Sequence, residues 1–229
     1  IQEIGQSLDT PDDLVFDLFA AACYDQHNLG RPILGTVGSV SSFQRADLEG
    51  FMNRFYGAGQ MLVVASGAVR HDDFVTRIGA SLGRLPDAQM AKRMPPSWSA
   101  GRQIVERDLE QSHIVFGLPT KAATAPDRFA LMALSTLYGG GMSSRLFQQV
   151  REQRGLCYSI FSFASLYSDI GVFSVYAGTS ASQANEMLAV AADELASIAH
   201  AVHPDEVTRA KAQLRASLLM SRESVSNCG

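Results

Sequence analysis

Apolar residues recur at helical spacing in two stretches near the beginning of the chain. Residues 10–22 carry them at positions 14, 15, 18, 19 and 22, with Thr10 and Pro11 at the start. Residues 42–56 repeat the pattern, and Gly57 follows as a stop signal. Between them, residues 29–36 hold two glycines and one proline in a short apolar run, which indicates a fixed loop.

The next stretch contains one predicted strand, one predicted helix and a break. Residues 61–66 are apolar and partly β-branched, which predicts a buried strand. Residues 71–82 carry an apolar side chain every fourth position, which predicts a helix ended by Gly83. Residues 86–102 lose all period among prolines, glycine and polar residues, so a linker and a domain boundary are expected there.

The second half mixes strand and helix patterns. Residues 104–109 and 113–118 predict strands, residues 127–138 and 144–153 predict helices, and residues 157–167 and 172–177 predict a hairpin. Two more helices are expected at the end, the second opening at Pro204. Hairpins without strict strand–helix alternation favour an α+β fold over a doubly wound sheet. The expected division is residues 1–90, a linker at 91–103, and residues 104–229.

Composition and charge narrow the class of protein. The chain has 229 residues, of which 46% are hydrophobic and 18% charged, and its net charge is -4. This is the composition of a globular protein, and it does not favour nucleic acid or an anionic membrane as partner. Cys23, Cys157 and Cys228 form no Cys-x-x-Cys pair, so no disulfide framework is expected. The chain shows no membrane-spanning run, no secretory leader and no initial Met, so we expect an internal piece of a cytoplasmic or periplasmic protein.

Several short motifs are better explained by structure than by chemistry. The glycines of residues 139–145 have no lysine where a phosphate-binding loop needs one, so they indicate a helix end and a turn. His200 and His203 lie just before Pro204 and predict helix capping. None of the five histidines belongs to a His-Glu-x-x-His motif or its inverse. Cys157 lies beside aromatic residues, where a buried thiol is commoner than a nucleophile.

Two longer segments resemble a known family. Residues 139–159, which read GGGMSSRLFQQVREQRGLCYS, are similar to the second-half signature of the pitrilysin-type zinc peptidases. Residues 1–36 resemble a first-half segment of the same superfamily, in its bacterial and mitochondrial processing-peptidase branch. The resemblance implies two similar lobes, each a mainly antiparallel sheet with helices packed on it, and both incomplete here. Residues 1–90 would end the zinc-binding half, and residues 104–229 would begin the substrate-clamping half.

The resemblance also implies roles for three residues. In the family an inverted His-x-x-Glu-His motif supplies two zinc ligands and a general base, and a later glutamate is the third ligand, which matches Glu3. The family's arginine and the tyrosine seven residues further on, which face the scissile peptide, match Arg151 and Tyr158. Without the family, Glu3 would be a solvated helix residue, Arg151 a cation at a helix end and Tyr158 a strand aromatic. Because the inverted motif is missing, we expect no activity and no catalytic zinc in this chain alone.

Two functions are consistent with these features. The first is a zinc-dependent endopeptidase that cleaves unfolded peptides or presequences. The alternative is a non-catalytic partner subunit of such a peptidase, which binds substrate or serves assembly, since members of the superfamily keep the fold without zinc. In both cases the expected partners are a peptide substrate and a second subunit, in a homodimer or heterodimer.

Overall fold

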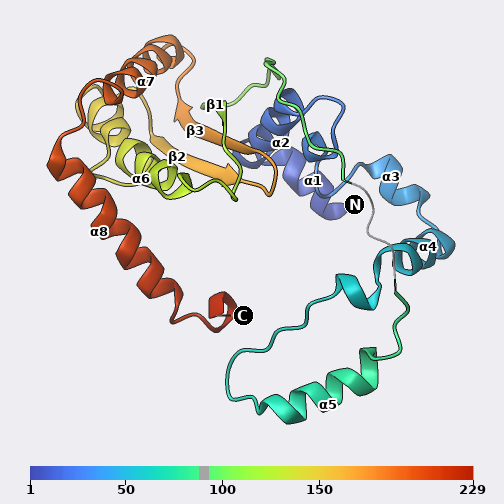
Figure 1. Ribbon diagram of the computed structural model, residues 1–229. Coiled ribbons are helices and arrows are strands. Elements are labelled where there is room, and N and C mark those ends of the chain that lie inside the picture. Colours follow the sequence, from blue (N-terminus) through green and yellow to red (C-terminus); the bar gives the residue numbers. More distant parts are fainter. Residues whose placement is uncertain (88–92, 229) are drawn as a thin grey trace. The chain divides into compact units, whose positions relative to one another are not determined.

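The computed structural model describes residues 1–87 and 93–228 (Figure 1). Positions 91 and 92 of the expected linker therefore lie outside the described residues. The α-helices are α1 (Gln2–Asp9), α2 (Pro11–Cys23), α3 (Val37–Ser42), α4 (Arg45–Phe55), α5 (His71–Leu82), α6 (Arg128–Gly139), α7 (Ala184–Ile198), α8 (Pro204–Ser221) and α9 (Val225–Cys228). Two short 3-10 turns are η1 (Asn28–Gly30) and η2 (Ala58–Gln60), and η3 (Phe147–Glu152) is a π-helix. The strands are β1 (Ser112–Thr120), β2 (Ser159–Leu166) and β3 (Gly171–Thr179).

The chain divides into two compact units. Unit 1 joins Ile1–Gly35 to Pro95–Arg215, and unit 2 joins Thr36–Met94 to Ala216–Gly229. All of the described strands belong to unit 1, which therefore contains the sheet and its core. The division of the chain into residues 1–90 and 104–229 stays a prediction about the two halves of a longer protein.

Unit 1 is built on an antiparallel sheet of order β1-β3-β2. β2 and β3 form the expected hairpin, and β1 pairs with the far side of β3 in a register that sets Phe116 opposite Val175. Every residue of β3 is buried. A central strand buried along its whole length needs cover on both faces of the sheet.

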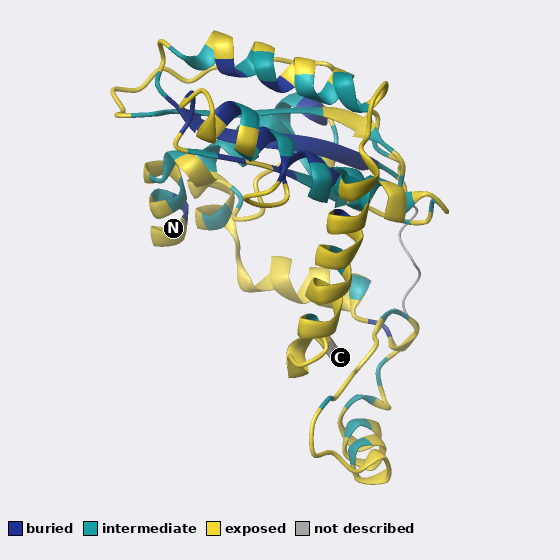
Figure 2. Cartoon of the chain, turned by 90° about the vertical axis from the view of Figure 1, so that its left-hand side faces the viewer, coloured by how far each residue is buried: buried dark blue, intermediate teal, exposed yellow. Residues whose placement is uncertain are grey.

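Helices supply that cover (Figures 1 and 2). On one face, α6, η3 and α7 pack around a core that includes Tyr138, Val150 and Met187, each fully buried. On the other face, Phe16 of α2 contacts the rings of Phe163 and Tyr176, with centroids 5.7 and 5.6 Å apart. The mixed fold confirms the α+β class, and it places the beginning of the chain against the sheet of the second half.

The two predicted strands outside this sheet are wrong. Residues 61–66 and 104–109 form no strand, although their side chains have the expected pattern. A β-strand forms only where a neighbouring strand pairs with its backbone N–H and C=O groups. The side-chain pattern of a segment does not show whether such a neighbouring strand is present. In unit 2, no strand is present among the described residues, so residues 61–66 have nothing within the unit to pair with.

The helix predictions are mostly confirmed, with differences at the ends. The helix predicted at residues 42–56 is α4, which begins three residues later than expected, after the backbone N–H of Gln44 donates to the Asp47 carboxylate, 2.9 Å away. Ser42 instead ends the short helix α3, which was not predicted. Thr10 precedes α2 as expected, but its hydroxyl donates to the carbonyl of Gln6 and does not cap the helix. α1 was not predicted. In the part of the chain that the structure describes, no helix is both long and apolar enough to cross a membrane.

Candidate functional site

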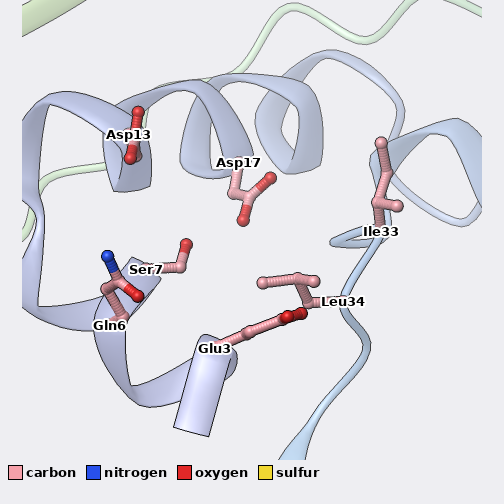
Figure 3. Close-up of a pocket in the computed structure, with 7 residues that line it drawn as sticks. All are labelled: Glu3, Gln6, Ser7, Asp13, Asp17, Ile33 and Leu34. Carbon is pink, nitrogen blue, oxygen red and sulfur yellow. The ribbon is translucent and has the colours of Figure 1, made fainter.

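Glu3 lies in the first turn of α1, on an exposed position beside the one buried residue of that helix, Ile4. Its carboxylate faces an open cavity of about 320 Å³ between α1, α2 and the loop after η1 (Figure 3). The cavity is lined by Glu3, Gln6, Ser7, Asp13, Asp17, Ile33 and Leu34. The predicted zinc ligand therefore borders a cavity in unit 1.

Two aspartates of α2 make this cavity acidic. Asp13 and Asp17 lie four residues apart, on one face of the helix, and the side chain of Asp17 points into the same space as Glu3 in Figure 3. Burial, and then the negative charge of Asp13, raise the pKa of Asp17 above its ordinary value. The spacing of these two carboxylates, four residues apart in a predicted helix, is the signal from which the acidic face could have been predicted.

These carboxylates do not make a complete metal site. Over residues 1–87 and 93–228, no group of three or more His, Cys, Asp or Glu side chains is arranged to hold a metal ion. A catalytic zinc usually takes three protein ligands and keeps one position for water. The described residues thus do not fit a whole zinc site, and the assignment of Glu3 as one ligand stays a prediction.

Arg151 lies in η3, which replaces the α-helix expected at residues 144–153. The backbone N–H of Gln153 donates to the carbonyl of Gln148, 3.0 Å away, which is the five-residue spacing of a π-helix. The guanidinium of Arg151 is exposed and stands over the ring of Phe147, 4.8 Å from its centroid. This contact holds the cation at the end of the helix without neutralising it.

Tyr158 lies immediately before β2, as expected. The residue is 61% exposed, and its backbone N–H donates to the carbonyl of Gly178, 2.8 Å away. The two preceding residues, Leu156 and Cys157, are buried in the core. Arg151 and Tyr158 are therefore the exposed ends of one short segment, in which residues 152–155 are exposed and the next two are buried, whereas Glu3 lies on a separate element, α1. Their catalytic roles stay predictions.

One histidine of the pair near the end of the chain, His203, caps helix α8 as expected, and the capping role of His200 stays a prediction. His203 precedes Pro204, its Nδ1 accepts the backbone N–H of Asp205, and its own N–H donates to the Glu206 carboxylate, 2.9 Å away. Glu206 also forms a two-pronged ion pair with Arg145, with both N–O distances at 2.7 Å. The glycine-rich segment thus ends at Arg145, whose ion pair with Glu206 has a structural role.

The two described cysteines are buried thiols. Cys23 is 4% exposed, and burial raises its pKa to about 11. Cys157 is 7% exposed, and burial raises its pKa against the opposing effect of the Arg151 charge. Both thiols are therefore protonated near neutral pH, and the reading of Cys157 as a buried structural residue is confirmed.

Comparisons with curated proteins define the class. The chain is 39% identical over 233 residues to an uncharacterized zinc protease of Streptomyces coelicolor, covering 97% of this chain and 51% of that protein. It is 35% identical over 226 residues to one of Rickettsia felis, with 98% and 55% covered. An uncharacterized zinc protease of Bacillus subtilis is 32% identical over 228 residues, with 99% and 56% covered. The chain spans about half the length of these relatives.

A family model gives the more particular assignment. The model described as the peptidase M16 inactive domain matches residues 42–214, which is most of the chain. The chain belongs to the peptidase M16 family, as the two sequence segments had suggested.

Solved structures agree with the fold. One chain of complex III2 from Candida albicans superposes with a TM-score of 0.91 and 18% identity, covering 99% of this chain and 57% of that one. A peptidase M16 inactive domain from Pseudomonas fluorescens gives a TM-score of 0.81 and 22% identity, with 92% and 52% covered. At these identities the likeness concerns the fold alone.

Proposed function

We propose that this chain is the middle of a zinc-dependent endopeptidase, in which it supplies one metal ligand and the groups that hold the peptide substrate. The observation that carries the proposal is the pairing of Arg151 and Tyr158, two exposed donors at the ends of one segment that Leu156 and Cys157 anchor in the core. Its relatives are named zinc proteases, which supports the same reaction class.

The pair suits the backbone of an extended peptide. Arg151 presents up to five N–H donors and remains charged at any physiological pH, and Tyr158 adds a neutral O–H donor. Donors fixed in advance can stabilise negative charge that develops on an attacked carbonyl. Neither residue needs to gain or lose a proton for this role, so the pair can bind substrate and orient it without acting as acid or base.

The acidic cavity supports a preference in the substrate. Glu3, Asp13 and Asp17 border the same open space, and burial, followed by repulsion from the charge of Asp13, raises the pKa of Asp17. A lysine or arginine side chain of the peptide would relieve that repulsion. We therefore propose unfolded peptides with basic residues as the substrate class, and further zinc ligands from outside this chain.

The full-length protein provides the test of the Glu3 assignment. Glu3→Gln should reduce the zinc content per chain and abolish cleavage of an unstructured, internally quenched peptide with one arginine, because the charge of the ligand is lost. Asp9→Asn is the matched control, since Asp9 is an exposed carboxylate on the same helix that does not line the cavity. Wild-type zinc content and cleavage in Glu3→Gln would refute the assignment.

A non-catalytic partner subunit is the second candidate. It is favoured by the family model, whose description is an inactive domain, and by the incomplete metal site among the described residues. If the full-length protein binds the peptide but neither binds zinc nor cleaves, this candidate replaces the first.

A further inference from the structure

The segment from Arg151 to Tyr158 contains a turn with an unusual backbone conformation. Gly155 has a φ of 62°, in the left-handed region that favours glycine. Its N–H donates to the carbonyl of Arg151 at 3.1 Å, and the N–H of Leu156 donates to the carbonyl of Val150 at 2.9 Å. These bonds end η3 and send the chain back toward the sheet.

The end of β3 holds the second part of this segment. Thr179 is completely buried, and its hydroxyl donates to the carbonyl of Leu156, 2.5 Å away. The preceding residue, Gly178, accepts the backbone N–H of Tyr158 at 2.8 Å. Two neighbouring residues of β3 thus fix the peptide groups on both sides of Cys157.

The choice of residue at 179 is informative. β-branched residues suit a strand, and valine has nearly the same shape as threonine, so packing alone does not require a hydroxyl there. The hydroxyl satisfies the carbonyl of Leu156, which lies in the core, where an unpaired carbonyl is costly. Thr179 therefore determines where the backbone lies just before the exposed tyrosine.

We propose that Thr179 is a positioning residue for substrate binding: through the carbonyl of Leu156, it sets the placement of Tyr158 relative to Arg151. The proposal rests on the proposed function, because it assumes that this pair holds the peptide. Thr179 is completely buried beside the segment and does not contact substrate. Its effect on the reaction is therefore indirect and depends on the positions of Tyr158 and Arg151.

The test compares three variants of the full-length protein. Thr179→Val removes the hydroxyl at constant shape, Thr179→Ser keeps it, and Ser162→Ala is the matched control. Ser162 is also buried and also donates its hydroxyl to a carbonyl, that of Ser135 at 2.8 Å, but this carbonyl belongs to α6 and not to the segment. The readouts are kcat and KM for the internally quenched peptide and the hydrogen exchange of the Tyr158 amide.

Thr179→Val should lower kcat about 10- to 100-fold, the range expected when a reacting geometry shifts by about an ångström. Exchange of the Tyr158 amide should become faster than in the wild type. Thr179→Ser should restore both values, and Ser162→Ala should change neither. If Thr179→Val keeps the wild-type kcat, or loses no more than Ser162→Ala does, the positioning role is wrong.

A second variant keeps the test decisive where Thr179→Val does not fold. Gly155→Ala strains the same turn while its new methyl group meets no atom within 4 Å, and Gly155→Asn should be tolerated better in this conformation. A lower kcat in Gly155→Ala that is partly restored in Gly155→Asn supports the proposal, and a wild-type kcat in both overturns it.

If Arg151→Ala and Tyr158→Phe themselves cleave at the wild-type rate, the proposed function fails, and the positioning role fails with it. If those two are impaired while the Thr179 variants are normal, only the positioning role fails.

Discussion

Replacing Glu206 by glutamine should lower the free energy of unfolding strongly, although glutamate and glutamine have nearly the same size and shape. The Glu206 carboxylate receives two bonds of 2.7 Å from Arg145 and one of 2.9 Å from the N–H of His203. Arg145 also donates to the hydroxyl of Ser197 and to the carbonyl of Ala201, at 2.7 and 2.6 Å. The ion pair and the neighbouring hydrogen bonds of Arg145 therefore join the turn before η3, the end of α7 and the start of α8.

The pKa of Glu206 gives the magnitude. Hydrogen bonding to Arg145 lowers it from 4.5 to about 2. At about 1.4 kcal/mol for each pH unit, this difference is worth roughly 3 kcal/mol in favour of the ionised carboxylate. The side chains of Arg145 and Glu206 are only 16% and 17% exposed, so solvent screens the pair little. We expect Glu206→Gln to lower the free energy of unfolding by about 2 to 3 kcal/mol at pH 7.

The assay is urea unfolding followed by circular dichroism, with Asp205→Asn as the matched control. Asp205 is the neighbouring carboxylate, 74% exposed and 3.5 Å from His203, so its loss should cost less than about 0.5 kcal/mol. Because the folded-state pKa of Glu206 is depressed, its stabilisation is complete above about pH 4.5 and is lost as the pH falls toward 2. The difference between wild type and Glu206→Gln should therefore shrink at pH 3. A Glu206→Gln variant no less stable than Asp205→Asn would refute this reasoning.

Two further predictions concern packing and thiol chemistry. Gly139→Ala should cost about 1 to 3 kcal/mol of unfolding free energy, because its methyl group would lie 2.4 Å from the backbone nitrogen of Ser162. Gly141→Ala is the control and should cost much less, because its methyl group meets only the flexible end of Gln213. Thermal unfolding of both variants measures the two losses, and equal losses would contradict the prediction. In a Cys228→Ser background, Cys23 and Cys157 should react with iodoacetamide at pH 8 far more slowly in the folded protein than in urea, because both thiols are buried and their pKa values are raised; equal rates in the two states would show that they are accessible.

Local patterns predicted the elements that need only local information. The hairpin of β2 and β3 and the helices α2, α5 and α6 were found from spacing and from the glycines at their ends. The strand predictions at residues 61–66 and 104–109 were wrong, because pairing in a sheet depends on a strand that lies far away in the sequence. The π-helix failed because a pattern near 3.6 residues per turn does not distinguish it from an α-helix.

The candidate site was less accessible to sequence reasoning than the fold. Glu3, Arg151 and Tyr158 each have an ordinary structural explanation, so only the resemblance to a family selected them. The acidic pair Asp13 and Asp17 carried a visible signal, because carboxylates four residues apart lie on one face of a helix. The bond from Thr179 to Leu156 joins two residues 23 positions apart, and it becomes visible only once the register of β3 against the segment is known.

The central claim is that Arg151 and Tyr158 hold the substrate of an M16 peptidase. The most direct measurement is kcat for the internally quenched peptide in full-length Arg151→Ala and Tyr158→Phe, beside Arg154→Ala and Tyr167→Phe. Arg154 is an exposed cation on the same segment, and Tyr167 follows the other end of β2. The account predicts losses of about 100- to 1,000-fold in the first two variants, with nearly unchanged stability, and wild-type rates in the two controls. Wild-type turnover in both Arg151→Ala and Tyr158→Phe would contradict it.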